Sequence, residues 1–296
     1  MLFKRVYLEI GNICNLRCAF CSPPVRPRRQ MTEEEFRSAV EQLRPYTDYL
    51  YLHIKGEPLC HPQLERFLEI CTELNYQVNI TTNATLLDKK GDLLLGSSAV
   101  RQVNLSLHSF SAHDGIDQGA YLDNALDFAI EMSKRGRFTV LRFWNLDGDR
   151  EAAAGTREIL RRIKAAFPGH DELEEQMATH RSVCLDKGIF VSFEEEFVWP
   201  DLSHPLLPES GFCHGLRQML GVLADGTVVP CCLDADGQAP LGNLFDEPLD
   251  DILARDPFLS ARKGFFNRKV LLDLCRHCSY RLRFDKKSLP SDVRSR

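Results

Sequence analysis

The stretch Cys14-Asn-Leu-Arg-Cys18-Ala-Phe-Cys21 places three cysteines in the spacing C-x3-C-x2-C, directly after the strand-like sequence at 6–10. Three thiolates on one short loop can hold three corners of a cubane [4Fe–4S] cluster and leave the fourth iron open. A structural zinc site needs four ligands. The motif therefore predicts a cluster held by Cys14, Cys18 and Cys21, with a zinc knuckle or a chance grouping as the competing interpretation.

The composition favours a metal-binding protein that stays in the cytoplasm. The chain has 296 residues, enough for one large domain or a large domain with a small one appended. Eleven cysteines without a secretory signal segment favour metal binding over a disulfide framework. No run approaches the ~18 apolar residues of a membrane-spanning helix. A net charge of −5 gives no strong nucleic-acid signal, so we expect neither a membrane nor a nucleic acid as partner.

Segments with strand and helix character alternate along the first two-thirds of the chain. Runs rich in β-branched and aromatic residues predict six strands, at 6–10, 49–54, 77–82, 102–109, 138–145 and 188–194. Amphipathic patterns predict helices between them, at 32–43, 61–74, 120–136 and 152–167. This alternation predicts an α/β fold with a parallel sheet, open or closed into a barrel. After residue 206 the sequence changes to a hairpin with an Asp225-Gly226 turn and short irregular segments.

The cysteine motif, with Phe20 before its last cysteine, resembles the cluster loop of the radical S-adenosylmethionine (SAM) superfamily. The resemblance covers nearly the whole chain and implies a partial (βα)6 TIM-type barrel over residues 1–206. It also implies that SAM binds the open iron and is cleaved reductively to a 5′-deoxyadenosyl radical, which abstracts hydrogen from a substrate. A reductant such as flavodoxin or ferredoxin would supply the electron.

Further residues at predicted strand ends resemble the positions that bind SAM in this superfamily. Lys55-Gly56-Glu57-Pro58 is similar to the family's Gly-Gly-Glu-Pro segment, with lysine in place of the first glycine. That segment holds the methionine amine in the family, and other positions line its carboxylate and ribose. The resemblance implies cofactor contacts for Phe20, Gly56, Glu57, Pro58, Asn83, Ser106, His108, Arg142 and Asn145. A purely structural role is the alternative for each of these residues.

A second set of cysteines follows the predicted barrel, at Cys213, Cys231, Cys275 and Cys278. It resembles the SPASM or twitch modules of radical SAM enzymes, which implies an auxiliary iron–sulfur module at 207–285 and a second [4Fe–4S] cluster. A tetrahedral zinc site with the same four thiolates is the competitor. Cys232 could replace Cys231, because neighbouring strand residues point to opposite faces. Residues 286–296 are expected to form a basic tail.

The substrate is the least constrained feature of the sequence. Arg26, Arg28 and Arg29 lie on a proline-rich stretch after the cluster motif, and guanidiniums suit phosphate or carboxylate recognition. A solvated surface loop is the alternative. Together with Lys55 these residues predict a small substrate, phosphorylated or nucleoside-like, as for a queuine-salvage-type lyase. A peptide-modifying maturase is the alternative, although only 13 residues precede Cys14 and a leader-binding domain would not fit there.

Two further hypotheses concern the chemistry itself. Cys60 follows the Lys55-Gly56-Glu57-Pro58 segment, and its thiol could donate a hydrogen atom to a substrate radical. From a different class, the chain could be a non-catalytic iron–sulfur carrier or a zinc-stabilised binding protein.

Overall fold

The computed structural model describes residues 2–22, 25–107, 109, 117–144, 150–180, 182–194 and 197–284. The strands are β1 (Arg5–Leu8), β2 (Tyr49–Tyr51), β3 (Gln77–Thr82), β4 (Val100–Ser106), β5 (Phe138–Trp144), β6 (Ser182–Asp186), β7 (Ile189–Glu194), β8 (Met219–Val222), β9 (Thr227–Val229) and β10 (Gly242–Asn243). All six predicted strands are present, as β1 to β5 and β7. The predicted α/β fold with a mostly parallel sheet is confirmed.

Helices separate most of the parallel strands, as the amphipathic patterns predict. They are α1 (Glu33–Leu43), α2 (Leu64–Glu73), α3 (Leu87–Gly96), α4 (Gln118–Lys134), α5 (Arg150–Ala166), α6 (Leu173–Thr179), α7 (Leu249–Leu253), α8 (Phe258–Phe266) and α9 (Asp273–Arg276). Thr32 and Glu35 begin α1 with a capping box, in which each side chain satisfies a backbone amide of the first turn. The sequence patterns missed α3, α6 and the three short C-terminal helices.

The chain divides into two compact units. One comprises Met1–Asn12, Pro24–Leu50 and Phe197–Arg296, and the other comprises Ile13–Pro23 and Tyr51–Glu196. Strand β1 belongs with the C-terminal segment because it pairs in parallel with β8, with Leu8 opposite Val222. The domain boundary expected at 206/207 stays a prediction.

In the unit that contains the cysteine motif, the strand order is β3-β4-β5-β7-β6. Neighbouring strands are parallel except β6, which pairs antiparallel with β7. The turn between them contains Gly188 at φ 78°, a conformation that glycine adopts at little cost. The sequence Asp186-Lys187-Gly188 was the available signal for this unpredicted strand.

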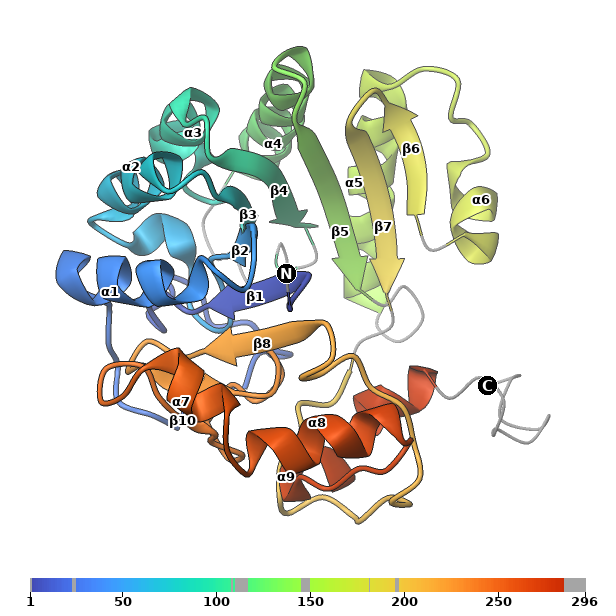
Figure 1. Ribbon diagram of the computed structural model, residues 1–296. Coiled ribbons are helices and arrows are strands. Elements are labelled where there is room, and N and C mark those ends of the chain that lie inside the picture. The colour runs from blue at the N-terminus through green and yellow to red at the C-terminus, as the bar shows by residue number, and fades with distance from the viewer. Residues whose placement is uncertain are drawn as a thin grey trace. The chain divides into compact units, whose positions relative to one another are not determined.

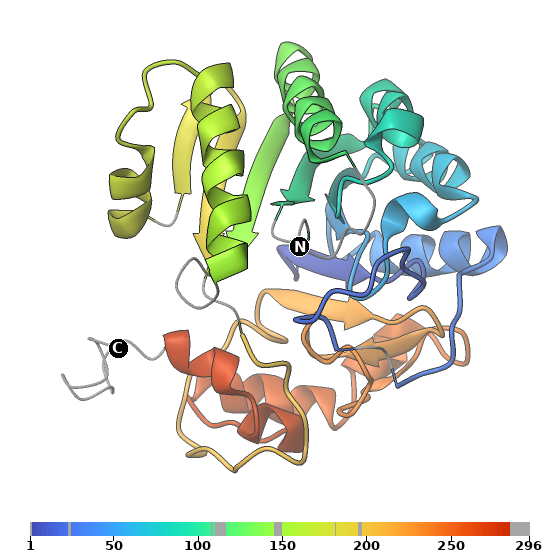
Figure 2. The ribbon, with the colours of Figure 1, turned by 180° about the vertical axis from the view of Figure 1, so that it is seen from behind.

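The two faces of this sheet differ in chemistry because successive strand residues point to opposite sides. One row joins Leu105, Leu141 and Val191 by register, and all three side chains are buried. Figures 1 and 2 show α4 and α5 on the same side of β5 and β7, and α4 contacts both strands. The opposite face carries Ser106, Arg142 and Ser192, also in register. The sheet therefore has one apolar face and one polar face.

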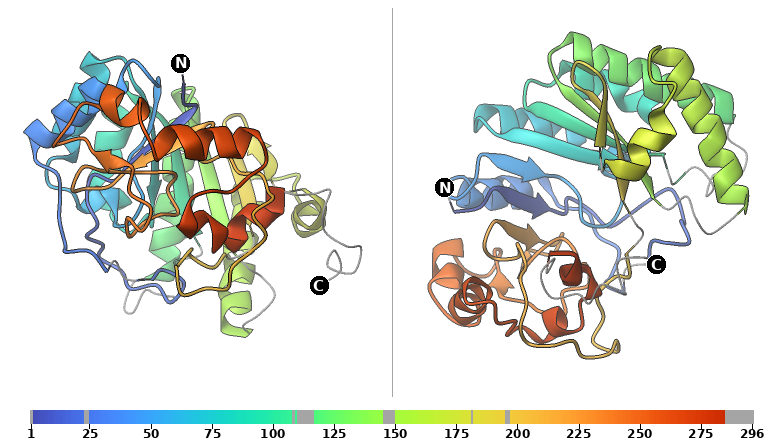
Figure 3. Two further views of the ribbon diagram at one scale, coloured as in Figure 1. Left: turned by 60° about the horizontal axis from the view of Figure 1, so that its bottom comes forward. Right: turned by 90° about the vertical axis from the view of Figure 1, so that its right-hand side faces the viewer.

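In the other unit the strand order is β10-β9-β8-β1-β2. The predicted hairpin is confirmed: β8 and β9 are antiparallel, and Gly226 has φ 86° in the turn between them. A side chain at Gly226 would clash with Phe245, since an added Cβ would lie 2.6 Å from that ring. Figure 3 shows the short helices α7, α8 and α9 grouped with this hairpin.

Candidate functional site

The loop after β1 brings the three motif cysteines together. The Cys21 amide donates to the Cys18 carbonyl at 3.1 Å, and the Leu16 amide donates to Cys14 Sγ at 3.3 Å. Desolvation, with the neighbouring thiols adding to it, raises the pKa of Cys14 to about 11 and that of Cys18 to about 12. Without a bound metal these thiols stay protonated. A metal cluster would stabilise their thiolate forms, so the three side chains suit a cluster.

Asparagines connect this loop to the end of β3. Asn83 Nδ2 lies 3.8 Å from Cys14 Sγ and donates to Asn15 Oδ1 at 3.0 Å. Asn15 Nδ2 in turn donates to Thr85 Oγ1 at 2.8 Å. Asn83 was predicted as a cofactor contact, and the structure brings it to the first cysteine of the motif. Its amide is therefore positioned to orient a cluster ligand.

Glu57 connects the Lys55-Gly56-Glu57-Pro58 segment to the same strand end. Its carboxylate accepts hydrogen bonds from Thr82 Oγ1 at 2.7 Å, the Asn83 amide at 2.8 Å and the Leu59 amide at 3.0 Å. Burial raises the pKa of Glu57 to about 6, and the hydrogen bonds oppose that shift. The Glu57 amide also donates to the Ile13 carbonyl at 2.9 Å. Glu57 thus fixes both the segment and the start of the cysteine loop.

Lys55 points into the cysteine loop. Its ammonium donates to the Ser22 carbonyl at 2.8 Å and to Ser22 Oγ at 2.9 Å, and lies 3.9 Å from Cys21 Sγ. The side chain is only 3% exposed. Its ammonium therefore serves the loop that carries the cysteines, and a contact of Lys55 with the substrate stays a prediction.

The other positions expected to contact the cofactor are distributed as follows. Gly56 has φ 78°, and Pro58 begins a buried turn of 3₁₀ helix at Pro58–Cys60. Phe20 lies in the cysteine loop between Cys18 and Cys21. Ser106 and Arg142 are register neighbours on β4 and β5. His108 and Asn145 lie outside the described residues.

His53 lies beside two residues of the polar sheet face, and the sequence analysis did not single it out. It lies near Arg142, and Thr81 Oγ1 is 3.2 Å from its Nε2. Burial and then the Arg142 charge lower the pKa of His53 to about 3, so the ring is neutral at physiological pH. The sequence feature that could have pointed to His53 is its position at the end of a predicted strand, two residues before Lys55.

Cys60 closes the turn after Glu57. Its thiol accepts a hydrogen bond from the Asn15 amide, and burial and then the Glu57 charge raise its pKa. A protonated thiol is the form that can donate a hydrogen atom. That role for Cys60 stays a prediction.

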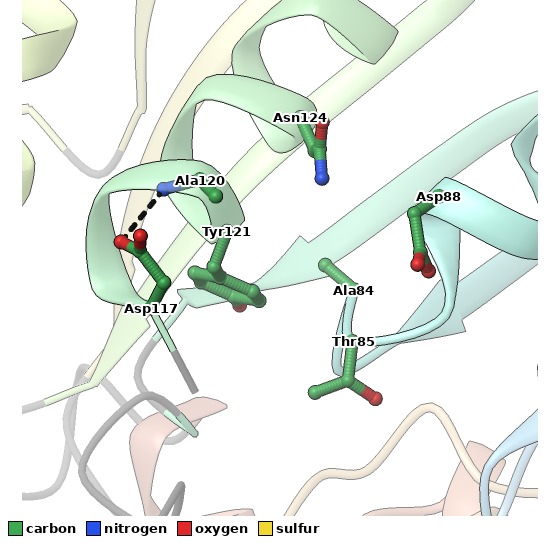
Figure 4. Close-up of a pocket in the computed structure, with 7 residues that line it drawn as sticks. All are labelled: Ala84, Thr85, Asp88, Asp117, Ala120, Tyr121 and Asn124. Atoms are coloured by element: carbon green, nitrogen blue, oxygen red, sulfur yellow. Dashed lines mark hydrogen bonds between the residues drawn. The ribbon is translucent and has the colours of Figure 1, made fainter. Parts of the chain in front are cut away.

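A small cavity of about 180 Å³ lies beside the segment that follows Asn83. Figure 4 shows Ala84 and Thr85 on one side and the first turns of α4 on the other, with Asp117 accepting from the Ala120 amide. It is smaller than most pockets for drug-sized ligands, which hold roughly 300–1,000 Å³. Asp117 is already engaged in capping α4.

The three arginines after the motif have different environments. Arg26 pairs with the buried Glu9, and its Nε donates to the Ala235 carbonyl at 3.0 Å. Arg29 pairs with Glu35 and donates to the Ala224 carbonyl. Arg28 is exposed. The charge of Arg26 is thus paired with Glu9. Substrate contacts of Arg26, Arg28 and Arg29 stay predictions.

The four C-terminal cysteines also converge. Burial raises the pKa of each, to about 11 for Cys213 and well above the ordinary value for Cys231 and Cys275. The Cys213 thiol is close enough to Cys231, Cys275 and Cys278 for mutual repulsion to add to this effect. An added Cβ at Gly215 would lie 3.7 Å from Cys213 Sγ and 3.9 Å from the Cys231 Cβ, so the glycine leaves space between them.

Arg281 organises this second set, and no sequence pattern identified it. It is 1% exposed and donates to the carbonyls of Cys275 at 3.0 Å and Pro208 at 2.5 Å. Its charge opposes the rise in the pKa of Cys275 and Cys278. A buried cation beside these thiols favours their thiolate forms.

Within the described ranges, no three Cys, His, Asp or Glu side chains are arranged to hold a single metal ion.

Comparison with known families identifies the two cysteine sets. Residues 8–153 match the Radical SAM superfamily model, and residues 213–279 match SPASM, an iron–sulfur cluster-binding domain. The chain belongs to the radical SAM superfamily. It is therefore an enzyme that uses SAM and [4Fe–4S] clusters. The different-class expectation of a non-catalytic carrier is wrong.

Curated relatives of this radical SAM enzyme act on substrates of different size. The PqqA peptide cyclase of Gluconobacter oxydans (strain 621H) is 22% identical, over 91% of this chain and 81% of the relative. The SAM-dependent 2-deoxy-scyllo-inosamine dehydrogenase of Niallia circulans is also 22% identical, over 94% and 93%.

Solved structures with the same fold include members that bind small molecules and members that bind peptides. BtrN in complex with AdoMet and 2-DOIA has a TM-score of 0.58 at 18% identity and covers 94% of both chains. Streptococcus suis SuiB bound to the precursor peptide SuiA has a TM-score of 0.62 at 18% identity, over 97% of this chain and 74% of that one.

The residues of the radical SAM enzyme fit the cofactors that its family uses. Cys14, Cys18 and Cys21 would hold the N-terminal cluster, which when bound supplies the electron for SAM cleavage. Asn83 lies within donor distance of Cys14 Sγ, and Lys55 lies within donor distance of Cys21 Sγ. None of the described helices is both long enough and apolar enough to span a bilayer.

Proposed function

We propose that this radical SAM enzyme abstracts a hydrogen atom from a small polar metabolite, phosphorylated or nucleoside-like, as a queuine-salvage-type lyase would require. The supporting observation is the hydrogen-bonded polar face of the sheet in the unit that contains the cysteine motif. Neutral amides, hydroxyls and an uncharged imidazole suit a ligand rich in hydroxyl groups or heterocyclic nitrogens.

Successive side chains on this face form one hydrogen-bonded series. Gln102 Nε2 donates to Asn104 Oδ1 at 2.8 Å, and Asn104 Nδ2 donates to Thr81 Oγ1 at 3.0 Å. Thr81 then contacts His53, as described above. These bonds hold each side chain in a fixed orientation, and a preorganised polar surface binds a small ligand at a lower entropic cost.

Two comparisons support a small substrate. The dehydrogenase relative aligns with this chain over more than nine-tenths of both lengths. BtrN, crystallised with AdoMet and 2-DOIA, aligns over the same share. In those two proteins, a chain of similar length is sufficient to act on or bind a small molecule.

A peptide substrate is the second candidate. It is favoured by the PqqA peptide cyclase relative and by the fold shared with SuiB bound to its precursor peptide. A radical SAM enzyme of this kind would modify a side chain of a ribosomal peptide.

The decisive experiment follows the hydrogen atom. Anaerobically reconstituted enzyme would be incubated with SAM, a low-potential reductant and candidate nucleosides, nucleotides or cyclitols, with a peptide library in parallel. Deuterium transferred from a labelled candidate into 5′-deoxyadenosine identifies the substrate class. Transfer from peptides alone contradicts the proposal.

A matched pair of variants tests the polar face. Thr81→Val removes one hydroxyl from the polar face, on β3. Thr139→Val makes the same change at a buried position on β5, on the apolar face of the sheet. Loss of one hydrogen bond is worth about 1 kcal/mol, so Thr81→Val should lower kcat/KM for the substrate about fivefold. SAM cleavage without substrate should be unchanged, and Thr139→Val should leave both values near the parent.

A further inference from the structure

The ammonium of Lys55 is buried among atoms of the cysteine loop. As described above, it contacts both oxygens of Ser22 and lies 3.9 Å from Cys21 Sγ. Burying an ammonium costs several kcal/mol unless its donors are satisfied. The Lys55 nitrogen therefore lies, with hydrogen-bond acceptors around it, next to a residue that would bind the N-terminal cluster.

The contacts of the ammonium differ in the strength of their acceptors. The carbonyl and hydroxyl of Ser22 are good acceptors. The ammonium also lies 3.9 Å from Cys21 Sγ, and a neutral thiol is only a weak acceptor. A thiolate is a much better acceptor and carries the opposite charge. The arrangement is therefore matched to Cys21 in its metal-bound, thiolate form.

Lys55 stands where the segment that it resembles has its first glycine. The family segment that it resembles has glycine here, which has no side chain. Gly56, at φ 78°, turns the backbone immediately after the lysine, and Glu57 anchors the segment through Thr82 and Asn83. The backbone that follows Lys55 is thus anchored by Glu57. The Lys55 side chain contacts Ser22.

We propose that Lys55 is a positioning residue that tunes the reduction potential of the N-terminal cluster. Hydrogen bonds and positive charge at cluster sulfurs stabilise the more negative, reduced state. When a low-potential donor such as flavodoxin or dithionite supplies one electron to a bound cluster, the ammonium of Lys55 would compensate the added negative charge without proton uptake. The inference rests on the family assignment, and it is independent of the substrate.

The test compares neutral and charged replacements. Lys55→Met keeps most of the side-chain length and removes the charge, and Lys55→Arg keeps the charge. Lys134→Met makes the neutral change on the surface of α4, where the lysine pairs with Glu131. The midpoint potential would be measured by EPR-monitored titration of the anaerobic full-length protein, without substrate. The signal to follow is the one that disappears when Cys14, Cys18 and Cys21 are all replaced.

We expect Lys55→Met to lower the reduced-to-oxidised ratio at a fixed potential about tenfold, a negative shift of about 59 mV for a one-electron couple. Lys55→Arg should restore at least half of that shift, and Lys134→Met should match the parent. A parental potential in Lys55→Met overturns the proposal. If Lys55→Met fails to load the cluster, Lys55→Gln retains a donor to Ser22 but lacks the charge, and a parental potential in that variant overturns it equally.

Discussion

Arg26 and Glu9 form a buried ion pair in which one guanidinium nitrogen of Arg26 lies 2.7 and 2.9 Å from the two carboxylate oxygens. Glu9 is fully buried, and it also accepts a hydrogen bond from the Ala224 amide at 3.0 Å. The pair connects the end of β1 with the segment after the cysteine loop, and Ala224 lies in the β8–β9 turn. Arg26 therefore contributes to the structure of this unit.

Replacing Arg26 should destabilise the protein strongly. Arg26→Met leaves the Glu9 carboxylate buried without its cation, which typically costs about 3–5 kcal/mol. Arg28→Met, at an exposed position in the same stretch, should change stability by less than about 0.5 kcal/mol. Anaerobic thermal unfolding of both variants makes the comparison. Equal stability together with a raised KM in Arg26→Met would instead assign Arg26 to substrate binding.

The N-terminal cluster should depend on all three motif cysteines. Anaerobic reconstitution should load about eight irons per chain, the content of two cubanes. Replacing Cys14, Cys18 and Cys21 with alanine should leave about four irons and abolish 5′-deoxyadenosine formation under dithionite. Iron analysis and chromatography of the products provide the two readouts. Continued 5′-deoxyadenosine formation in the triple variant would refute this ligand assignment.

The auxiliary site should lose its cluster when its C-x2-C pair is removed. Replacing Cys275 and Cys278 should lower the iron content by about four, while the EPR signal of the first cluster with SAM persists. Because ligand binding also stabilises small metal-bound units, proteolysis after about Leu206 should become faster. Replacement of Cys232 serves as the matched control and should keep full iron. One cubane and one zinc in the parent protein would rule out a second cluster.

Arg142 should contribute to SAM binding through its guanidinium. A bidentate arginine makes two charge-assisted hydrogen bonds to a carboxylate, and lysine cannot reproduce that geometry. Arg142→Lys should raise the apparent Kd for SAM about tenfold with an unchanged cluster spectrum. Arg137→Lys is the control, because Arg137 donates to the carbonyls of Leu94 and Leu95 just before β5. An unchanged Kd in Arg142→Lys would make Arg142 a structural residue of the sheet.

His53 should make the protein less stable in acid. Its pKa is about 3 in the fold, against about 6.5 in the unfolded chain, so only the unfolded state binds the proton between these values. This contribution to stability is present above pH 6.5 and decreases as the pH falls toward 3, by about 1 kcal/mol between pH 7.5 and 5.5. His53→Gln should lose less stability over that interval than the parent, and the exposed His180→Gln should not differ. Thermal unfolding at both pH values measures the effect, and identical losses in His53→Gln and the parent would show that His53 does not titrate in this way.

The sequence by itself determined the features that depend on neighbouring residues. The spacing of Cys14, Cys18 and Cys21 is a local property, since one loop carries all three thiols. Strand patterns of period two and the cap at Thr32 act over a few residues, and the structure has the corresponding strands and the start of α1. Asp225-Gly226 likewise predicted its own hairpin, because the turn requires φ > 0 at the glycine.

Only the tertiary structure decided the contacts that join distant segments. The direction of Lys55 toward Ser22, the pairing of Arg26 with Glu9 and the position of His53 near Arg142 depend on how strands and loops pack. A charged residue has the same appearance in a sequence whether it faces solvent, a substrate or a buried partner. Its role is set by the desolvation cost and by the partner that offsets it, and both exist only once the chain has folded.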